Sequence, residues 1–161
     1  VAATIESVRE TVKKARISGK KIGLVPTMGA LHIGHVSLIE AAAKNCDFVV
    51  VSIFVNPTQF APDEDYEKYP RPIDDDLKVC DEHNVDLVFL PEQKQMYPSQ
   101  SLTWVEVEIL TEPLCGRFRP GHFRGVTTVC NKLFNIVLPD VAYFGQKDAQ
   151  QTIVIKKWSP T

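Results

Sequence analysis

The sequence is poor in the features that mark secreted, membrane-spanning and metal-binding proteins. Its 161 residues include 4 cysteines, none in a C-x-x-C pair and none at a spacing that fits a zinc template. The longest apolar runs, such as residues 48–51, are far too short to span a bilayer, and the N-terminal residues show no secretory signal pattern. We therefore expect a cytoplasmic protein with free thiols and no membrane partner.

An excess of charge of one sign is also missing. The 18 Lys and Arg nearly balance the 20 Asp and Glu, and the net charge of −2 gives no reason to expect a nucleic-acid partner. The 44% hydrophobic and 24% charged residues are typical of a globular protein. No internal repeat is visible, so we expect one domain over residues 1–161 with a substantial core.

The order of the apolar segments predicts alternating strands and helices. The β-branched run Phe48–Val55 has no alternation, which is typical of a strand covered on both faces. Residues 152–155, inside the last expected helix, are also β-branched and could form a strand instead. Strands are expected at 20–25, 48–55, 85–90 and 141–144 and, at an edge, 103–109; helices are expected at 4–18, 35–45, 74–83, 125–138 and 148–157. This order predicts an α/β fold, a doubly wound parallel sheet flanked by helices.

The stretch Val25–Leu38 organises the rest of the chain. It leaves the first expected strand, enters the next helix, and carries His32 and His35 with Gly34 between them. The first turn of a helix has free N–H groups and a positive dipole end, and glycine lets a nucleotide approach the backbone, so the stretch is suited to binding phosphate. The histidines could instead be solvated or capping residues, or share a zinc ion, although no nearby Cys or acid completes a zinc site.

Several other loops should meet this stretch. Ligands of doubly wound sheets bind outside the carboxyl ends of the strands, so loops 26–34, 56–60, 114–124 and 145–148 should converge if they leave the same edge. The polar side chains of these loops include no convincing nucleophile–base pair. They favour charge stabilisation of a phosphate-bearing substrate. The polar and cationic residues expected to converge are His32, His35, Asn56, Gln59, Arg119, His122, Gln146, Lys147, Gln150 and Gln151.

Each of these side chains also has an ordinary structural explanation. Lys147 could be a solvated lysine, although a cation at a helix start is unfavourable unless an anion is bound there. The arginines 117, 119 and 124 could be solvated loop charges. Residues 74–76 are three acids, which more often occupy the first turn of a helix than bind a metal ion.

Five stretches together are similar to one known family. They are Pro26–His35, Phe54–Phe60, Tyr69–Arg71 with Asp74–Leu77, Arg119–Val126 and Phe144–Gln151. They occur in the same order as in the pantothenate synthetases (pantoate–β-alanine ligases), and the resemblance covers roughly residues 4–155. This family shares its H-x-G-H motif with nucleotidyltransferases and class I aminoacyl-tRNA synthetases. The resemblance implies a Rossmann-like fold and a two-step reaction. Pantoate attacks the α-phosphorus of ATP to give pantoyl adenylate and pyrophosphate, and β-alanine then displaces AMP.

The resemblance also implies roles for individual residues. His35 would be the acid, with His32 beside it and Lys147 supplying positive charge. Gln59 and Gln151 would hold pantoate, and Gln59 would also lie near β-alanine. Mg²⁺ would bridge ATP oxygens, with Asp75 as a protein ligand. The implied ATP-binding residues are Met28, Gly29, Ala30, Leu31, His32, Ile33, Gly34, His35, Gly145, Gln146, Lys147 and Asp148.

Members of the family form homodimers and continue into a smaller C-terminal domain whose Met-Ser-Ser-Arg-Asn loop closes on the phosphates. The 161 residues contain no such string, and residues 158–161 depart from the family pattern. We therefore expect an N-terminal domain or partial chain that binds ATP or pantoate weakly and turns over slowly. The alternatives are another H-x-G-H nucleotidyltransferase, a tRNA synthetase fragment, or a non-catalytic module that keeps the fold and pairs with a partner.

Overall fold

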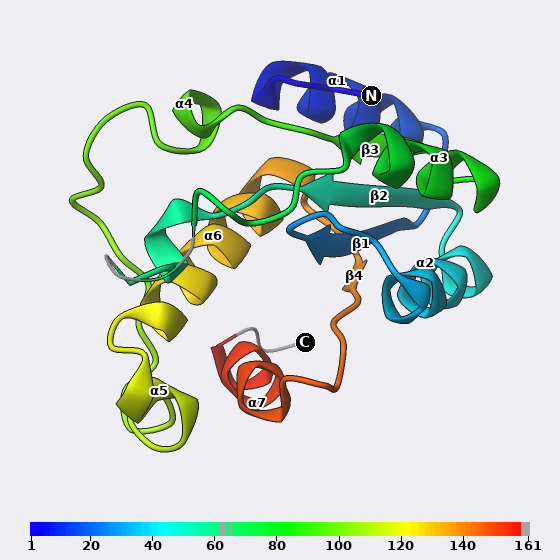
Figure 1. Cartoon of the computed structure of the whole chain (residues 1–161). Helices are drawn as coiled ribbons and strands as arrows, with labels where there is room; N and C mark the ends of the chain where they lie inside the picture. The colour runs from blue at the N-terminus through cyan, green and yellow to red at the C-terminus, as the bar shows by residue number, and fades with distance from the viewer. Residues whose placement is uncertain (62–63, 65, 159–161) are drawn as a thin grey trace.

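Four parallel strands form the centre of the molecule, in the order β3–β2–β1–β4 (Figure 1). The computed structural model describes residues 1–61, 64 and 66–158, so residues 62, 63, 65 and 159–161 of the expected domain lie outside it. The strands are β1 (Ile22–Thr27), β2 (Phe48–Ile53), β3 (Leu87–Phe89) and β4 (Val141–Ala142). The chain builds the sheet outward from β1 to β3 and then places β4 on the other side of β1. The boundary between β1 and β4 is therefore a topological switch point, where such sheets open a crevice.

Helices cover both faces of this sheet, which confirms the predicted fold class. They are α1 (Ile5–Ile17), α2 (Ile33–Asn45), α3 (Ile73–Glu82), α4 (Gln93–Met96), α5 (Cys115–Phe118), α6 (His122–Val137) and α7 (Ala149–Trp158), with the short 3₁₀ helix η1 (Pro57–Gln59). None of the helices in the described part of the chain is long and apolar enough to cross a membrane. In Figure 1, an extended segment after β4 leads to α7, which lies apart from the strands.

The core consists of two apolar clusters, one on each face of the sheet. Leu24 and Val50 point into the cluster formed with α1 and α6, and their neighbours Val25 and Val51 point into the cluster formed with α2 and α3. All four side chains are fully buried, and each such burial stabilises the fold by about 1.5–3 kcal/mol. This double coverage is the physical reason that β2 has no polar alternation, as the sequence predicted.

The prediction of an edge strand at 103–109 is wrong. Residues 101–107 contain no strand, and residues 108–110 form a turn. The hydroxyl of Thr127 donates to the carbonyl of Val105, and the Val105 N–H donates to Thr128 Oγ1 at 3.1 Å. Side chains of α6 therefore satisfy the backbone groups that a neighbouring strand would otherwise satisfy.

Other expected elements differ only at their ends. Residues 152–155 are helical within α7, so the alternative of a strand there is wrong. Helix α6 starts at His122, before the predicted start at 125, and β4 stops at Ala142, before the predicted end at 144. The chain between β4 and α7 is therefore free to form a loop at the open end of the sheet.

Candidate functional site

A cleft of about 680 Å³ opens at the carboxyl ends of β1 and β2, beside the switch point between β1 and β4. Its walls come from the loop between β1 and α2, from the 56–60 loop, from α6 and from the segment that joins β4 to α7. The predicted site residues that line it are Met28, His32, Gly34, His35, Gln59, Gly145, Gln146, Lys147, Asp148 and Gln151. Segments far apart in the sequence thus bring both histidines and the lysine to one cavity.

Five of the residues expected to bind ATP or a metal ion do not line this cleft. Gly29, Ala30, Leu31 and Ile33 lie next to the histidines in the chain but are not part of the wall, and Ile33 is 82% exposed. Asp75 is exposed on α3, away from the cleft. Any contact of residues 29–31 with a nucleotide would therefore be made by their backbone.

The two histidines cap helix α2. Nδ1 of His32 accepts a hydrogen bond from the Gly34 N–H at 3.0 Å, and Nδ1 of His35 accepts one from the His32 N–H at 3.3 Å. The ring centroids are 4.2 Å apart. Because both Nδ1 atoms accept, each neutral imidazole carries its proton on Nε2, which remains available to donate to a ligand. Capping and phosphate binding, two alternatives from the sequence, are therefore compatible here.

His35 is held in its neutral form. Burial lowers its pKa, the neighbouring His32 lowers it further, and the nearby carboxylate of Asp76 raises it. Burial dominates, so the pKa of His35 lies below its ordinary value of 6.5 and the ring is neutral at pH 7. Its contribution to an anion site at that pH is a directed hydrogen bond with no net charge.

Gln59 is held in place by the buried amide of Asn56. Asn56 is 1% exposed, and its Nδ2 donates to Gln59 Oε1 and to the Gly125 carbonyl, both at 3.1 Å. The Tyr97 hydroxyl donates to Asn56 Oδ1 at 2.9 Å, which fixes the orientation of the amide. Nε2 of Gln59 lies 3.1 Å from Met28 Sδ, at the cleft wall. Asn56 is therefore a positioning residue for Gln59.

Gly125 lets η1 lie directly against α6. A Cβ at this position would sit 2.4 Å from the Thr58 carbonyl oxygen, closer than a real Cβ can approach backbone. Glycine at this helical position thus has a packing reason, which outweighs its usual cost in a helix interior. The contact holds η1 beside α6, whose Val126 and Val129 also line the cleft.

The 114–124 loop supports the cleft from behind. Arg119 donates to both carboxylate oxygens of Glu64, at 2.7 and 3.0 Å, and to Nε2 of His122 at 3.2 Å. His122 Nδ1–H in turn donates to the Gln59 carbonyl at 2.9 Å. Hydrogen bonding from Arg119 lowers the pKa of the Glu64 carboxyl to about 2. None of residues 114–124 lines the cleft, so the expected convergence holds for the other three loops only.

The segment that joins β4 to α7 contributes an exposed cation. Lys147 and Asp148 are exposed at the wall of the cleft, directly before α7 begins at Ala149. A lysine there opposes the helix dipole unless an anion lies between them. Gln150, also expected in the site, instead bonds to the backbone around 110–115 through its amide, whereas Gln151 lines the cleft.

Asp76 is the residue that sequence reasoning missed. Of the three acids at 74–76, only Asp76 is buried, at 1% exposure. Its Oδ2 accepts from the Ala30 N–H at 2.9 Å and its Oδ1 from the Leu31 N–H at 2.7 Å. The signal was present in the sequence, because Ile73, Leu77 and Cys80 mark the inward stripe of α3 and Asp76 falls on it.

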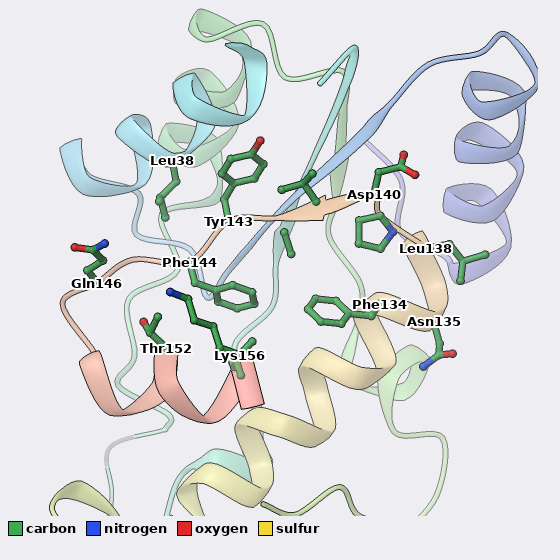
Figure 2. Close-up of a pocket in the computed structure, with 14 residues that line it drawn as sticks. Leu38, Phe134, Asn135, Leu138, Asp140, Tyr143, Phe144, Gln146, Thr152 and Lys156 are labelled. Carbon is green, nitrogen blue, oxygen red and sulfur yellow. The ribbon is translucent and has the colours of Figure 1, made fainter. Parts of the chain in front are cut away.

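A second cavity, of about 820 Å³, lies alongside β4. Figure 2 shows Phe144 and Phe134 side by side in its wall, with Lys156 and Thr152 reaching in from α7. The two phenylalanine rings make an edge-to-face contact, and their centroids are 6.3 Å apart. It shares Leu38, Phe144 and Gln146 with the cleft but contains neither histidine nor Lys147. The two imidazoles and Lys147 therefore line the cleft and not this second cavity.

The described residues offer little to hold a metal ion. Among them, no group of three or more His, Cys, Asp or Glu side chains is arranged to bind one. Asp148 is the one carboxylate among the described residues that line the cleft. A magnesium ion there would take most of its ligands from water and from a bound phosphate, as this ion commonly does.

Comparison with known proteins identifies the family. Residues 1–159 match the family model described as pantoate–β-alanine ligase. The chain belongs to this family. The alternative of an aminoacyl-tRNA synthetase fragment is therefore wrong.

Individual relatives in the ligase family are close in sequence and in structure. The pantothenate synthetase of Thermoanaerobacter pseudethanolicus is 60% identical over 157 residues, which cover 98% of this chain and 56% of the relative. That of Moorella thermoacetica is 59% identical, covering 96% and 54%. The crystal structure of the Thermus thermophilus enzyme superposes with a TM-score of 0.91 at 45% identity, covering 97% of this chain and 55% of that one.

A further crystal structure of the family is described as a ligand complex. The Francisella tularensis pantoate–β-alanine ligase, described as complexed with beta-gamma ATP and β-alanine, superposes with a TM-score of 0.91 at 43% identity. The alignment covers 97% of this chain and 60% of that one. The chain thus spans about half the length of the ligases it matches, for example 56% of the Thermoanaerobacter pseudethanolicus protein.

Proposed function

We propose that this chain is the nucleotide- and pantoate-binding domain of an ATP-dependent ligase that joins pantoate to β-alanine. The carboxylate of pantoate attacks the α-phosphorus of ATP and pyrophosphate leaves; the amine of β-alanine then attacks the pantoyl adenylate and AMP leaves. The observation that carries this proposal is the presence of His32, His35 and Lys147 in one cleft with Gln59 and Gln151.

The phosphates of ATP lie against the start of α2. The Nε2–H groups of His32 and His35 donate to phosphate oxygens, and the free N–H groups and dipole of the helix favour the same anion. Lys147 supplies a positive charge beside these hydrogen-bond donors. Negative charge grows on the pyrophosphate as the bond to the α-phosphorus breaks, and these donors stabilise that charge.

Pantoate is held by the two glutamines. The amides of Gln59 and Gln151 line the same cleft and can bond to the hydroxyl and carboxylate groups of this substrate. Gln59 is fixed by Asn56, so it presents the same geometry to each substrate molecule. The Francisella tularensis relative, described as complexed with beta-gamma ATP and β-alanine, supports placing both ligands in this fold, and we place β-alanine near Gln59.

Magnesium enters this scheme as the counterion of ATP. Asp75, the protein ligand suggested by the family resemblance, is exposed on α3 and outside the cleft, so it does not fit that role in this structure. The steps described above depend on the chain's own donors and on Lys147. The compartment we propose is the cytoplasm, in keeping with four free cysteines, two of them buried.

We propose that a second copy of the chain covers an apolar segment between α4 and α6. This segment exposes large hydrophobic side chains to solvent, at fractions from 37% for Trp104 to 88% for Leu102. Such exposure favours an interface over a free surface. The remaining exposed members are Ile109, Leu114 and Phe118. Light scattering should give a dimer mass, and Leu102→Ser with Phe118→Ser should give a monomer; a monomer from the unaltered chain would refute this interface.

The proposed chemistry is tested by pyrophosphate exchange. Pantoate should drive incorporation of labelled pyrophosphate into ATP, and an amino acid should not. Because the 161 residues contain no Met-Ser-Ser-Arg-Asn string, we expect exchange slower than in a full-length relative. A rate equal to that of the relative would mean that the loop is dispensable. A flat calorimetric titration with ATP, followed by no exchange, would reject the function itself.

A further inference from the structure

The turn that precedes the two histidines has a strained backbone. Gly29 has φ +84° and Ala30 has φ +51°, so two successive residues lie in the left-handed region, which a residue with a Cβ rarely adopts. A Cβ on Gly29 would also sit 2.8 Å from Oδ2 of Asp76. Something outside the turn must therefore hold it in this shape.

The carboxylate of Asp76 is the group that holds it. Its two oxygens accept from the successive N–H groups of Ala30 and Leu31, at 2.9 and 2.7 Å, and the residue is only 1% exposed to solvent. Asp76 also lies in the first turn of α3, where the helix dipole favours a negative charge. Leu31 is followed directly by His32, the N-cap of α2. The shape of the turn therefore determines the position of the helix start and of both capping histidines.

We propose that Asp76 is a positioning residue for ATP binding, whose carboxylate fixes the turn at residues 29–31 and so aims Nε2 of His32 and His35 at the phosphates. This inference depends on the ATP site proposed above. It adds a role for an acidic side chain that touches neither substrate, on a helix that contributes no residue to the cleft.

The chemistry requires a carboxylate. Asparagine has nearly the same shape, but its carboxamide offers one acceptor and turns its NH₂ toward a backbone N–H, so one hydrogen bond is lost and two donors face each other. Removing a negative charge near an ATP site should, by Coulomb's law alone, tighten the binding of this anion. Positioning predicts the opposite sign, which makes the substitution diagnostic.

The test compares Asp76→Asn with Asp74→Asn in the full chain. Asp74 is exposed two residues earlier in the same helical turn, so its replacement removes the same charge without touching the loop. Calorimetry should show ATP affinity falling about 10-fold or more for Asp76→Asn, the loss expected for one charge-assisted hydrogen bond. Asp74→Asn should bind ATP as tightly as the unaltered chain, or slightly more tightly.

A spectroscopic reading separates positioning from loss of fold. Asp76 raises the pKa of His35 against the effect of burial, so an NMR titration should show that pKa lower in Asp76→Asn and unchanged in Asp74→Asn. In the unaltered chain, the amide hydrogens of Ala30 and Leu31 should exchange with solvent at least about 10-fold more slowly than in an unstructured peptide. This last measurement needs no variant, so it stands even if Asp76→Asn fails to fold.

Equal ATP affinity in Asp76→Asn and the unaltered chain would overturn the inference, and so would unprotected amides at positions 30 and 31. If the unaltered chain bound no ATP, the proposed function would fail and this inference would fail with it. That result differs from the first, in which ATP binds and the substitution has no effect.

Discussion

The histidine loop at residues 27–35 and the arginine loop at residues 114–124 were both expected in the site, and the structure uses them differently. The first lines the cleft with imidazoles whose Nδ1 atoms are occupied by backbone N–H groups. The second lies behind the cleft, where Arg119 is paired with Glu64 and His122 bonds to the Gln59 backbone. A charged or imidazole side chain near a strand end therefore indicates a site only when its polar atoms are not already satisfied by the protein.

The largest effect should come from the histidine loop itself. His35→Ala removes an Nε2–H donor from the phosphates, and loss of one such donor typically lowers a rate by about 10²–10³-fold. Pantoate-driven pyrophosphate exchange measures this, and the circular dichroism spectrum should stay unchanged. His83→Ala, at the end of α3 and away from the cleft, is the matched control and should keep full exchange. Equal loss in both variants would contradict the role of His35.

Gly125→Ala tests the support that α6 gives to the 56–60 loop. The added Cβ would approach the Thr58 carbonyl to 2.4 Å, so η1 must move, at a cost of about 1–3 kcal/mol in unfolding free energy. Gly145→Ala places a Cβ with no atom within 4 Å and should change stability by less than about 0.5 kcal/mol. Urea unfolding of both variants gives the comparison; similar stabilities would mean that α6 and η1 are not in tight contact.

Arg119→Met should weaken the arginine loop without affecting ATP. The Arg119–Glu64 pair is partly exposed, at 36% and 28% of the side chains, so its loss should cost about 1 kcal/mol at pH 7. The folded-state pKa of Glu64 is lowered from 4.5 to about 2, so the pair stabilises the fold fully above pH 4.5 and loses this effect as pH falls through 2. The stability difference between Arg119→Met and the unaltered chain should therefore shrink in acid.

ATP affinity provides the check on that variant. Arg119 does not line the cleft, so calorimetry should give an ATP dissociation constant within about 2-fold of the unaltered chain, a difference below about 0.5 kcal/mol. A loss of ATP affinity of about 10-fold or more in Arg119→Met would place the arginine in the ATP site and remove the distinction between the two loops.

The smallest effect is expected beneath the histidine loop, at Ser52. Its hydroxyl is buried with no hydrogen-bond partner among the described residues, so Ser52→Ala should be neutral or stabilise the fold by up to about 1 kcal/mol. Thr27→Val is the contrasting change, because Thr27 Oγ1 donates to the Ser52 carbonyl and accepts from the Gly29 N–H. Thermal unfolding should rank Ser52→Ala above Thr27→Val; the reverse order would show that the serine hydroxyl has a partner.

Much of the fold was predictable because burial dictates pattern. The run Phe48–Val55 indicated a strand covered on both faces, and the short run before Pro26 indicated a second strand. The two core clusters, one on each face of the sheet, both contain side chains from these two strands. The prediction of an edge strand at 103–109 failed because the sequence of this segment does not determine which part of the chain it pairs with. Thr127 and Thr128 of α6 form the hydrogen bonds with the Val105 backbone, and a tertiary contact of this kind cannot be predicted from the local sequence pattern.

The residues that line the candidate site were easier to predict from the sequence than the buried residues that hold them in place. His32, His35 and Lys147 could be located because strand ends of a parallel sheet share one edge. Asp76 and Asn56 were not assigned roles, since both act through buried hydrogen bonds to other parts of the chain. Such residues are recognised by an unexpected polar side chain on an apolar face, and Asp76 on the inward stripe of α3 had that signature.

The central claim is that the phosphates of ATP meet the Nε2–H groups of His32 and His35. Histidine ¹⁵N NMR tests it most directly. Before ATP is added, both rings should show a protonated Nε2 and an unprotonated Nδ1. Adding ATP should shift Nε2 of both, while His83 and His122 stay unchanged. Bound ATP that shifts His83 or His122 and leaves His32 and His35 unmoved would contradict the account.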